Sequence, residues 1–370
     1  MYYIGLISGT SMDAIDCALL NVADKNITLT AYQQYPIDHA IRAVLKSVNK
    51  DTAISTICRL DVSLGKIFAG AALSIIDESG VKKSEIVAIG SHGQTVFHHP
   101  EKPTACSLQI GDANSIAHYT GLTTVADFRC MDMAAGGEGA PLAPVIHDVL
   151  FRQNDSDTVV VNIGGMANFT YLPARNSKRE ISGFDTGPGN VLMDEWIKQN
   201  KQQDYDKDGA WAASGRVNEE LLQQLLSCHY FSEAPPKSTG RDDFNLDWLE
   251  DQMAVFNRAL PEQEVQATLL ALTAVSIADA IRQHAASADK VIICGGGAHN
   301  LHLMQALHNN LEGYEVCSSD ALGYNPDAIE AMCFAWLARC RLEEIPGNII
   351  SVTGASAPRL LGAVYQATAK

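Results

Sequence analysis

The sequence predicts an α/β protein that is divided into two domains. The chain has 370 residues, and domains commonly contain about 100–200 residues each. Short apolar segments of strand length alternate with longer segments of helical periodicity, an order typical of α/β folds with partly parallel sheets. The pattern starts again near residue 125, where an apolar segment, a turn of small residues and a second strand follow one another as they do at the N-terminus.

The first half begins with three predicted strands, Tyr2–Ser8, Asp13–Val22 and Ile27–Tyr35. Apolar residues spaced three and four apart then predict a long helix over Thr52–Glu78, which ends near Gly80. The other elements predicted in this half are a helix at Ile41–Val48 and strands at Ile86–Gly90, Leu108–Asp112 and Thr123–Phe128.

The second half contains strands at Thr158–Asn162, Ala167–Leu172 and Lys290–Cys294. The segment Val159–Leu172 repeats the strand, small-residue turn and amphipathic strand of Ile4–Leu20, which indicates a weak internal duplication. The remaining segments predict helices, of which Glu264–His284 is apolar on more than one side and is expected to be buried: Pro141–Phe151, Asn190–Gln199, Val217–Ser227, Asn245–Arg258, Glu264–His284, a helix from Asn300, Asp327–Arg341 and Arg359–Thr368.

Composition limits the possible partners and the compartment. The formal net charge is −16, and such a surface repels polyanions, so no nucleic-acid partner is expected. The nine cysteines show no CxxC spacing and predict reduced, buried thiols rather than disulfides or a zinc site. We find no signal-peptide pattern and no run near 18 apolar residues, so we expect a cytoplasmic protein that does not span a membrane.

Several familiar signatures are absent from the sequence. It contains no GxxxxGK[ST], no GxGxxG after a strand, no HExxH and no GxSxG. A nucleotide would therefore have to be held by other turns, through backbone N–H groups, a helix N-terminus and a divalent cation.

Four glycine-rich segments are candidates for such a role. Gly9–Asp13 is either a phosphate-binding turn or a plain hairpin turn, and Gly183–Asn190 is predicted to be a rigid turn that presents Asp185. Cys294–Asn300 would let a flat ring or a phosphate approach the backbone closely, and Ala134–Pro141 is interpreted as a flexible substrate loop or hinge.

Polar clusters lie between these turns, and each has two interpretations. His92, in Ser91–Thr95 after a strand, is either a candidate base or a structural histidine. Arg129 forms either an ion pair with Asp127 or a fork for a substrate carboxylate. Glu330, on a predicted helix, is either exposed or accepts hydrogen bonds from substrate hydroxyls, and the basic loop Lys237–Arg241 is consistent with contact to an anion.

Two repeated turns, a carboxylate among glycines and a late triple-glycine turn match a two-lobed phosphotransferase. In these motifs the sequence resembles the anhydro-N-acetylmuramic acid kinase family, which belongs to the superfamily of sugar kinases, chaperone ATPases and actin. The matching stretches follow one another along nearly the whole chain: Ile4–Leu20, Ser91–Pro100, Ser107–Ala117, Val125–Pro144, Val161–Pro173, Gly183–Asp194, Lys237–Asn245, Cys294–Asn300 and Asn325–Ala338.

The resemblance implies a two-lobed actin-like ATPase fold, in which each lobe is a ribonuclease-H-like five-stranded mixed sheet flanked by helices. The expected lobes are residues 1–124 with 348–370, to which a C-terminal helix returns, and residues 125–347. The implied reaction opens the 1,6-anhydro ring of 1,6-anhydro-N-acetylmuramic acid with water and phosphorylates O6 from ATP, with Mg²⁺, to give N-acetylmuramate 6-phosphate and ADP. The family also implies a homodimer and a place in cell-wall sugar recycling.

The resemblance also assigns roles to residues. Asp185 is expected to be the general base for the attacking water, and Thr95, Arg129 and Glu330 are expected to hold the sugar and its lactyl carboxylate. The direct ligands of Mg²⁺ are not specified. The expected nucleotide-binding residues are Gly9, Thr10, Ser11, Met12, Asp13, Ala14, Ile15, Asp16, Gly165, Gly187, Gly295, Gly296 and Gly297.

Three positions depart from the family pattern: Ala14 stands where glycine is expected, Glu138 where glutamine is expected, and Asp242 where glutamate is expected. Two alternative functions stay open. One is a non-catalytic actin-like or chaperone-like ATPase switch, which would have no need of Arg129 and Glu330. The other is a hydrolase that uses His92 or Asp185 without ATP.

Overall fold

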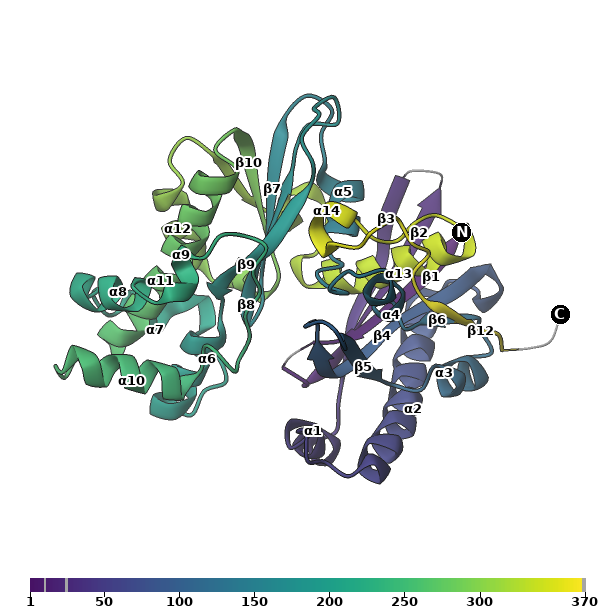
Figure 1. Cartoon of the computed structure of the whole chain (residues 1–370). Coiled ribbons are helices and arrows are strands. Elements are labelled where there is room, and N and C mark those ends of the chain that lie inside the picture. The colour runs from purple at the N-terminus through teal and green to yellow at the C-terminus, as the bar shows by residue number, and fades with distance from the viewer. Residues whose placement is uncertain (10, 24–25, 368–370) are drawn as a thin grey trace. The chain divides into compact units, whose positions relative to one another are not determined.

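The computed structural model describes residues 1–9, 11–23 and 26–367. The chain forms two compact units: unit 1 comprises Met1–Leu150 with Ala328–Lys370, and unit 2 comprises Phe151–Asp327 (Figure 1). The structure thus divides the chain after residues 150 and 327, whereas the sequence suggested divisions after 124 and 347. The difference arises because the segments on either side of unit 2 pack on the sheet of unit 1.

Unit 1 is built on a seven-stranded sheet with the order β12-β6-β4-β1-β2-β3, and β5 pairs with the far part of β4. β2 runs antiparallel to β1 and β3, while β4 is parallel to β1 and β6 is parallel to β4. The strands are β1 (Tyr2–Ser8), β2 (Ala14–Ala23), β3 (Asn26–Pro36), β4 (Ile86–His99), β5 (Cys106–Ile110), β6 (Thr124–Ala126) and β12 (Ala363–Tyr365).

Unit 2 repeats this plan in a five-stranded sheet with the order β11-β10-β7-β8-β9. The first three strands form an antiparallel meander, and β10 and β11 continue in parallel beyond β7. Both sheets therefore have the strand order third, second, first, fourth, fifth, to which unit 1 adds β5 and β12. The strands are β7 (Asp157–Ile163), β8 (Met166–Leu172), β9 (Ser182–Pro188), β10 (Ala288–Cys294) and β11 (Glu315–Ser318).

This shared order confirms the predicted fold class and the internal duplication. The two similar sequence segments form the equivalent central hairpins, β1–β2 and β7–β8. The number of strands differs in unit 1, which has seven rather than the five expected.

Helices cover both sheets. In unit 1 they are α1 (His39–Lys46), α2 (Ile54–Ser79), α3 (Ala113–Thr120), α4 (Cys130–Ala134), α5 (Pro144–Phe151, whose last residue belongs to unit 2), α13 (Ile329–Leu342) and α14 (Ile350–Thr353). In unit 2 they are α6 (Val191–Lys201), α7 (Ala210–Ala213), α8 (Glu219–Leu226), α9 (His229–Ser232), α10 (Leu246–Phe256), α11 (Glu262–His284) and α12 (Leu301–Asn310).

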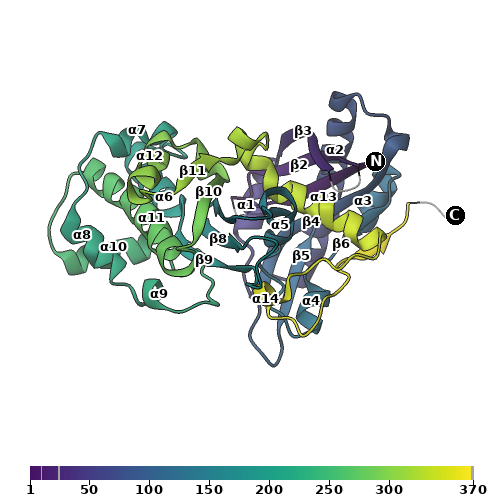
Figure 2. The same cartoon turned by 90° about the horizontal axis from the view of Figure 1, so that it is seen from above.

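Helix α13 lies directly on β1 and β4 in unit 1 (Figure 2). The contact is backbone to backbone, because Gly5 and Gly90 face it: a Cβ at Gly5 would collide with the carbonyl oxygen of Ala331, and a Cβ at Gly90 with that of Phe334. The other main helix of unit 1, α2, contributes Leu64 and Phe68 to the hydrophobic core, and both side chains are fully buried.

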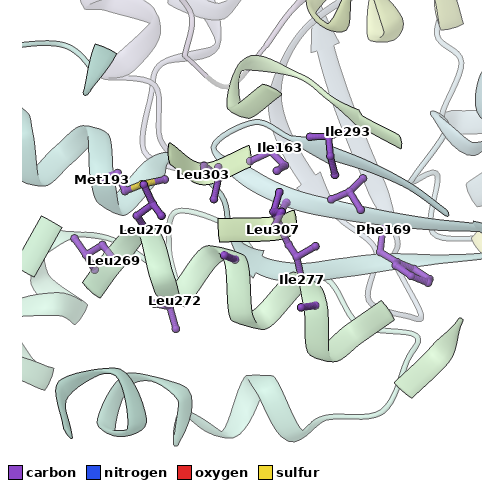
Figure 3. Packing of buried hydrophobic residues seen from close by; sticks show 14 of the residues in the cluster. Ile163, Phe169, Met193, Leu269, Leu270, Leu272, Ile277, Ile293, Leu303 and Leu307 are labelled. Atoms are coloured by element: carbon purple, nitrogen blue, oxygen red, sulfur yellow. The ribbon is translucent and has the colours of Figure 1, made fainter. Parts of the chain in front are cut away.

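The core of unit 2 is built from apolar side chains. Ile163 and Phe169 from the sheet, Ile277 from α11 and Leu303 from α12 belong to one buried cluster (Figure 3). Among the described residues α11 is the one helix long and apolar enough to cross a membrane, but 78% of its most apolar window is buried inside the protein. That burial is typical of a core helix and agrees with the predicted burial of Glu264–His284.

Two local predictions are wrong. Arg359–Thr368 does not form a helix within the described residues, because Gly362 adopts a positive φ of 93° and residues 363–365 pair with β6. The C-terminal segment therefore returns to unit 1 as the strand β12, not as a helix. Gly183–Asn190 is not simply a turn, because most of it forms β9 and pairs with β8.

Candidate functional site

The turn between β1 and β2 is compact and polar. The N–H of Met12 donates to the carbonyl of Gly9 at 3.2 Å, and Met12 adopts a positive φ of 56°. The hydroxyl of Ser11 donates to the carboxylate of Asp13, and both residues are exposed. A Cβ at Gly9 would meet nothing within 4 Å, so open space adjoins the backbone there. Thr10, also expected to bind nucleotide, lies outside the described residues.

The next three expected nucleotide-binding residues begin β2 and have different surroundings. Ala14 is half-buried, whereas Ile15 is fully buried in the core of unit 1. The carboxylate of Asp16 accepts hydrogen bonds from the Tyr32 hydroxyl at 2.5 Å and from the Gln34 amide at 3.1 Å. The side chain of Ile15 therefore serves packing, and only its backbone is left for a ligand.

The equivalent turn of unit 2 joins β7 to β8 at Gly164 and Gly165. The carbonyl of Gly164 accepts a hydrogen bond from the N–H of Asn190, and that of Gly165 accepts one from the N–H of Gly189, both at 2.8 Å. The last two residues of the glycine-rich segment Gly183–Asn190 are thus hydrogen-bonded to this turn. Gly187 has a φ of 141°, and an added Cβ would lie 2.7 Å from the ring of Phe231.

The triple glycine after β10 packs on the same end of the sheet. A Cβ at Gly295 or Gly297 would collide with Asn162 or Ile163 at the end of β7. Gly296 differs, because its Cβ would find nothing closer than the side-chain nitrogen of Asn190, at 3.8 Å. The structure therefore brings the expected nucleotide-binding glycines of unit 2 together, and of the three consecutive glycines Gly296 is the exposed one.

Asp185 lies on the edge strand β9 and is held at both carboxylate oxygens. The amide of Asn168 on β8 donates to Oδ1, and the backbone N–H of Thr239 donates to Oδ2 at 3.1 Å. Its own N–H donates to the carbonyl of Lys237 at 3.2 Å, and the Tyr230 hydroxyl donates to its carbonyl at 2.6 Å. Burial raises the pKa of Asp185 to about 6, although the Thr239 and Asn168 hydrogen bonds lower it.

This environment suits a general base. The carboxylate is half-buried and ionised at neutral pH, and its raised pKa makes it more basic than an ordinary aspartate. The basic loop after α9 contributes to its support. Lys237 donates to the carbonyl of Tyr230 at 2.9 Å and lies 4.5 Å from the centre of that ring.

The residues expected to bind the sugar belong to unit 1, where a polar cluster connects two of them. Gln109 donates to the Thr95 hydroxyl at 3.2 Å, and that hydroxyl lies 3.4 Å from Nε2 of His92. A terminal nitrogen of Arg129 lies 3.2 Å from the same Nε2. Burial lowers the pKa of Arg129 to about 10, and the negative charge of Glu330 opposes that shift. The structure thus brings Thr95, Arg129 and Glu330 into one neighbourhood.

His92 is buried at this cluster, and its ring stacks on Phe334 of α13 with 4.4 Å between the centroids. Burial, with the charges of Arg129 and His98, lowers the pKa of His92 well below its ordinary value. Burial and the stack on Phe334, together with a lowered pKa, favour a structural role over the catalytic one.

Some residues of this arrangement were not predicted from the sequence. Asn168, Tyr230 and Thr239 hold Asp185, but they are distant from it in sequence and lie in an ordinary strand, a short helix and a loop. The loop Lys237–Arg241 was predicted to contact an anion. In the structure this loop also supports the carboxylate of Asp185, to which the N–H of Thr239 donates a hydrogen bond. The charge of the loop did not indicate this.

The glycine-rich segment Ala134–Pro141 was interpreted as flexible, but it is anchored within unit 1. The buried carboxylate of Asp132 accepts hydrogen bonds from the N–H of Gly139 at 2.9 Å and from Asn348 and Thr353, both at 2.7 Å. Glu138, which departs from the family pattern, is exposed. Asp242, a second departure, is exposed as well.

No group of three or more His, Cys, Asp or Glu side chains within the described ranges could hold a metal ion alone. Mg²⁺ does not need such a group, since it is usually bound by one or two carboxylates together with substrate phosphates. The oxygen-rich turn with Ser11, Asp13 and Asp16 has donor chemistry that fits Mg²⁺ on these terms.

Two α/β units of one strand order, each with a glycine-containing turn between its first two strands, define the class of actin-like ATPases and sugar kinases. Comparison with known proteins gives the particular family. The family model for anhydro-N-acetylmuramic acid kinase matches residues 1–367, and the chain therefore belongs to that family.

Curated relatives agree with this assignment. The anhydro-N-acetylmuramic acid kinase of Coxiella burnetii (strain RSA 493 / Nine Mile phase I) is 47% identical over 363 residues, which cover 98% of this chain and 97% of the relative. The enzyme of that name from Shewanella woodyi is 45% identical over 368 residues, 99% of each chain. Among solved structures, the activator of 2-hydroxyisocaproyl-CoA dehydratase from Clostridium difficile with bound ADPNP covers 93% of this chain and 98% of its own, at 11% identity and a TM-score of 0.45. The assignment depends on the first two findings and not on this distant likeness.

Proposed function

We propose that this protein is an ATP-dependent kinase that opens the 1,6-anhydro ring of 1,6-anhydro-N-acetylmuramic acid with water and phosphorylates O6. The products are N-acetylmuramate 6-phosphate and ADP. Family membership supports the reaction class, and the observation that carries the mechanism is Asp185, a half-buried carboxylate whose two oxygens are held by Asn168 and Thr239. This reaction belongs to the recycling of cell-wall sugars.

In this mechanism Asp185 accepts a proton from the water that attacks the anomeric carbon. The new C1–O bond forms as the C1–O6 bond breaks, so O6 leaves with the electron pair of that bond. O6 then attacks the γ-phosphorus of ATP, and the bond from the γ-phosphorus to the oxygen bridging it to ADP breaks. A positioned base commonly contributes about 10²–10⁴ in rate, and alignment with charge stabilisation supplies most of the remainder.

The glycine turns are the proposed ATP site. Gly9–Asp16 in unit 1 and Gly165 and Gly187 in unit 2 would hold the phosphates through backbone N–H groups, and Gly295–Gly297 would lie beside the adenosine. Gly296 supports the last assignment, because it is exposed and has no side chain to hinder a ligand that approaches its backbone. Mg²⁺ bound near Ser11, Asp13 or Asp16 would neutralise charge on the transferred phosphoryl group.

Arg129, Thr95 and Glu330 are the proposed sugar-binding residues. The guanidinium of Arg129 would bind the lactyl carboxylate, since its planar fork matches two carboxylate oxygens. Thr95 and Glu330 would bind hydroxyl groups of the ring. We also expect a cytoplasmic homodimer with small-molecule partners only; the net charge of −16 supports the expectation that it binds no nucleic acid.

The reaction can be tested with purified protein, ATP, Mg²⁺ and 1,6-anhydro-N-acetylmuramic acid, with the products followed by mass spectrometry. The expected product is the sugar with one added water and one added phosphoryl group, and its formation requires ATP. Ring opening in ATP-free buffer would instead support a hydrolase. ATP hydrolysis with no sugar product would support a nucleotide switch.

A further inference from the structure

His92 has a clear position but no part in the proposed chemistry. Its side chain is 5% exposed, and its ring lies almost parallel to that of Phe334, with an interplanar angle of 6°. This stack fixes the plane of the imidazole. It also directs Nε2 to the point where a terminal nitrogen of Arg129 approaches to 3.2 Å.

Donor chemistry identifies the form of the imidazole. A guanidinium has five N–H donors and no acceptor, so Nε2 of His92 has to accept the hydrogen bond from Arg129 and carries no proton. The Thr95 hydroxyl can donate to Nε2 from 3.4 Å, because Gln109 in turn donates to the Thr95 oxygen. All these donors point toward one neutral acceptor, and the ring proton resides on Nδ1.

Arg129 is incompletely satisfied by the protein. Its Nε–H is buried and has no hydrogen-bond partner. A buried donor without an acceptor carries an energetic cost, and such a group in a native protein calls for an explanation. A ligand carboxylate is the complementary acceptor, since it can accept hydrogen bonds from more than one N–H of a guanidinium.

We propose that His92 is a positioning residue that fixes the guanidinium plane of Arg129 and so makes the site selective for sugars that carry a carboxylate. A flexible arginine would lose side-chain entropy each time it bound a carboxylate, whereas a guanidinium held by His92 has lost part of that entropy already. This inference rests on the proposed function, because it takes the lactyl carboxylate as the ligand of Arg129.

The first test replaces His92 by phenylalanine, which keeps a ring against Phe334 and removes the acceptor, and by glutamine, which retains an acceptor oxygen. For His92→Phe we expect KM for 1,6-anhydro-N-acetylmuramic acid to rise at least tenfold while kcat changes less than threefold. The inhibition constant of 1,6-anhydro-N-acetylglucosamine, which lacks the lactyl group, should change less than twofold. His92→Gln should restore part of the lost affinity.

Equal losses of affinity for the two sugars would overturn the proposal. In an Arg129→Ala chain no guanidinium is left to position, so adding His92→Phe should cost little more affinity. A further tenfold loss in that double variant would also overturn the proposal. If the wild type phosphorylates the sugar and His92→Phe loses affinity equally for both sugars, only the role of His92 is refuted. If the wild type phosphorylates no sugar, the proposed function is refuted. A measurement independent of turnover is ¹⁵N NMR of histidine-labelled wild-type protein. It should show an unprotonated Nε2 on His92, and a protonated Nε2 would overturn the proposal whatever the enzyme does.

Discussion

The two units share a strand order but differ in how a long helix meets the sheet. In unit 1, α13 lies so close to β1 and β4 that only glycine fits at Gly5 and Gly90, which face helix carbonyl groups. In unit 2, α11 faces its sheet with apolar side chains such as Ile277, in the buried cluster of Figure 3. The first contact is backbone to backbone, and the second is an ordinary layer of side chains.

The proposed functional residues of the two units have correspondingly different surroundings. The close approach of α13 brings Phe334 onto His92 and places the charge of Glu330 where it acts on Arg129. In unit 2 the proposed catalytic carboxylate, Asp185, lies on the edge strand, and a neighbouring strand and a loop hold it. One topology thus carries the proposed sugar-binding residues beside a closely packed helix and the proposed base on an edge strand.

The largest expected effect is on the edge-strand site. Asp185→Asn should lower kcat by about 10²–10⁴, because the amide cannot accept the proton from water. ATP affinity, measured by calorimetry, should stay nearly unchanged. Asp242→Asn is the matched control, since Asp242 is an exposed acid close to the supporting loop. Retention of more than a tenth of the wild-type rate by Asp185→Asn would refute the general-base role.

The next effect tests the helix contact of unit 1. Gly90→Ala should lower the free energy of unfolding by about 3 kcal/mol, because the added methyl group overlaps the carbonyl of Phe334 and the helix has to move. Gly296→Ala in unit 2 is the control, and it should change stability by less than about 1 kcal/mol. Both are measured by urea denaturation, and a similar small effect for the two would contradict the proposed difference in packing.

A smaller effect is expected at the proposed sugar-binding residues of unit 1. Arg129→Ala should raise KM for 1,6-anhydro-N-acetylmuramic acid about 10–100-fold, since hydrogen bonds to charged groups contribute roughly 1.5–3 kcal/mol. The affinity for the analogue without the lactyl group should change much less. Arg179→Ala, which removes a half-exposed arginine paired with Asp157 in unit 2, serves as the control. Equal changes for both sugars would show that Arg129 does not recognise the carboxylate.

The smallest effect is a pH dependence. Asp185 acts as a base only when deprotonated, and its pKa is raised to about 6, so kcat should fall as the pH drops through that value. The limit at low pH is a tenfold decrease per pH unit. The residual rate of Asp185→Asn should lack this limb. A wild-type profile that stays flat down to pH 4.5 would assign the base to another group.

Local patterns predicted much of the fold and some of the site. The hairpins β1–β2 and β7–β8 were predictable because an apolar strand, a short turn of small residues and an amphipathic strand follow one another in both, and Asp185 was notable among its glycines. The pairing of β9 could not be predicted, since its glycines suggested a turn. In the structure, Gly187 is needed because the ring of Phe231 packs against it. The contacts of Asp185 with Asn168 and Thr239, and of His92 with Arg129, join residues distant in sequence, and no local pattern encodes them.

The most direct test of the central claim is a crystal structure of the protein with 1,6-anhydro-N-acetylmuramic acid and a non-hydrolysable ATP analogue. We expect a carboxylate oxygen of Asp185 within hydrogen-bond reach, about 2.6–3.2 Å, of a water aligned with the anomeric carbon. A complex in which that carboxylate faces bulk solvent, or in which another side chain holds this water, would contradict the mechanism.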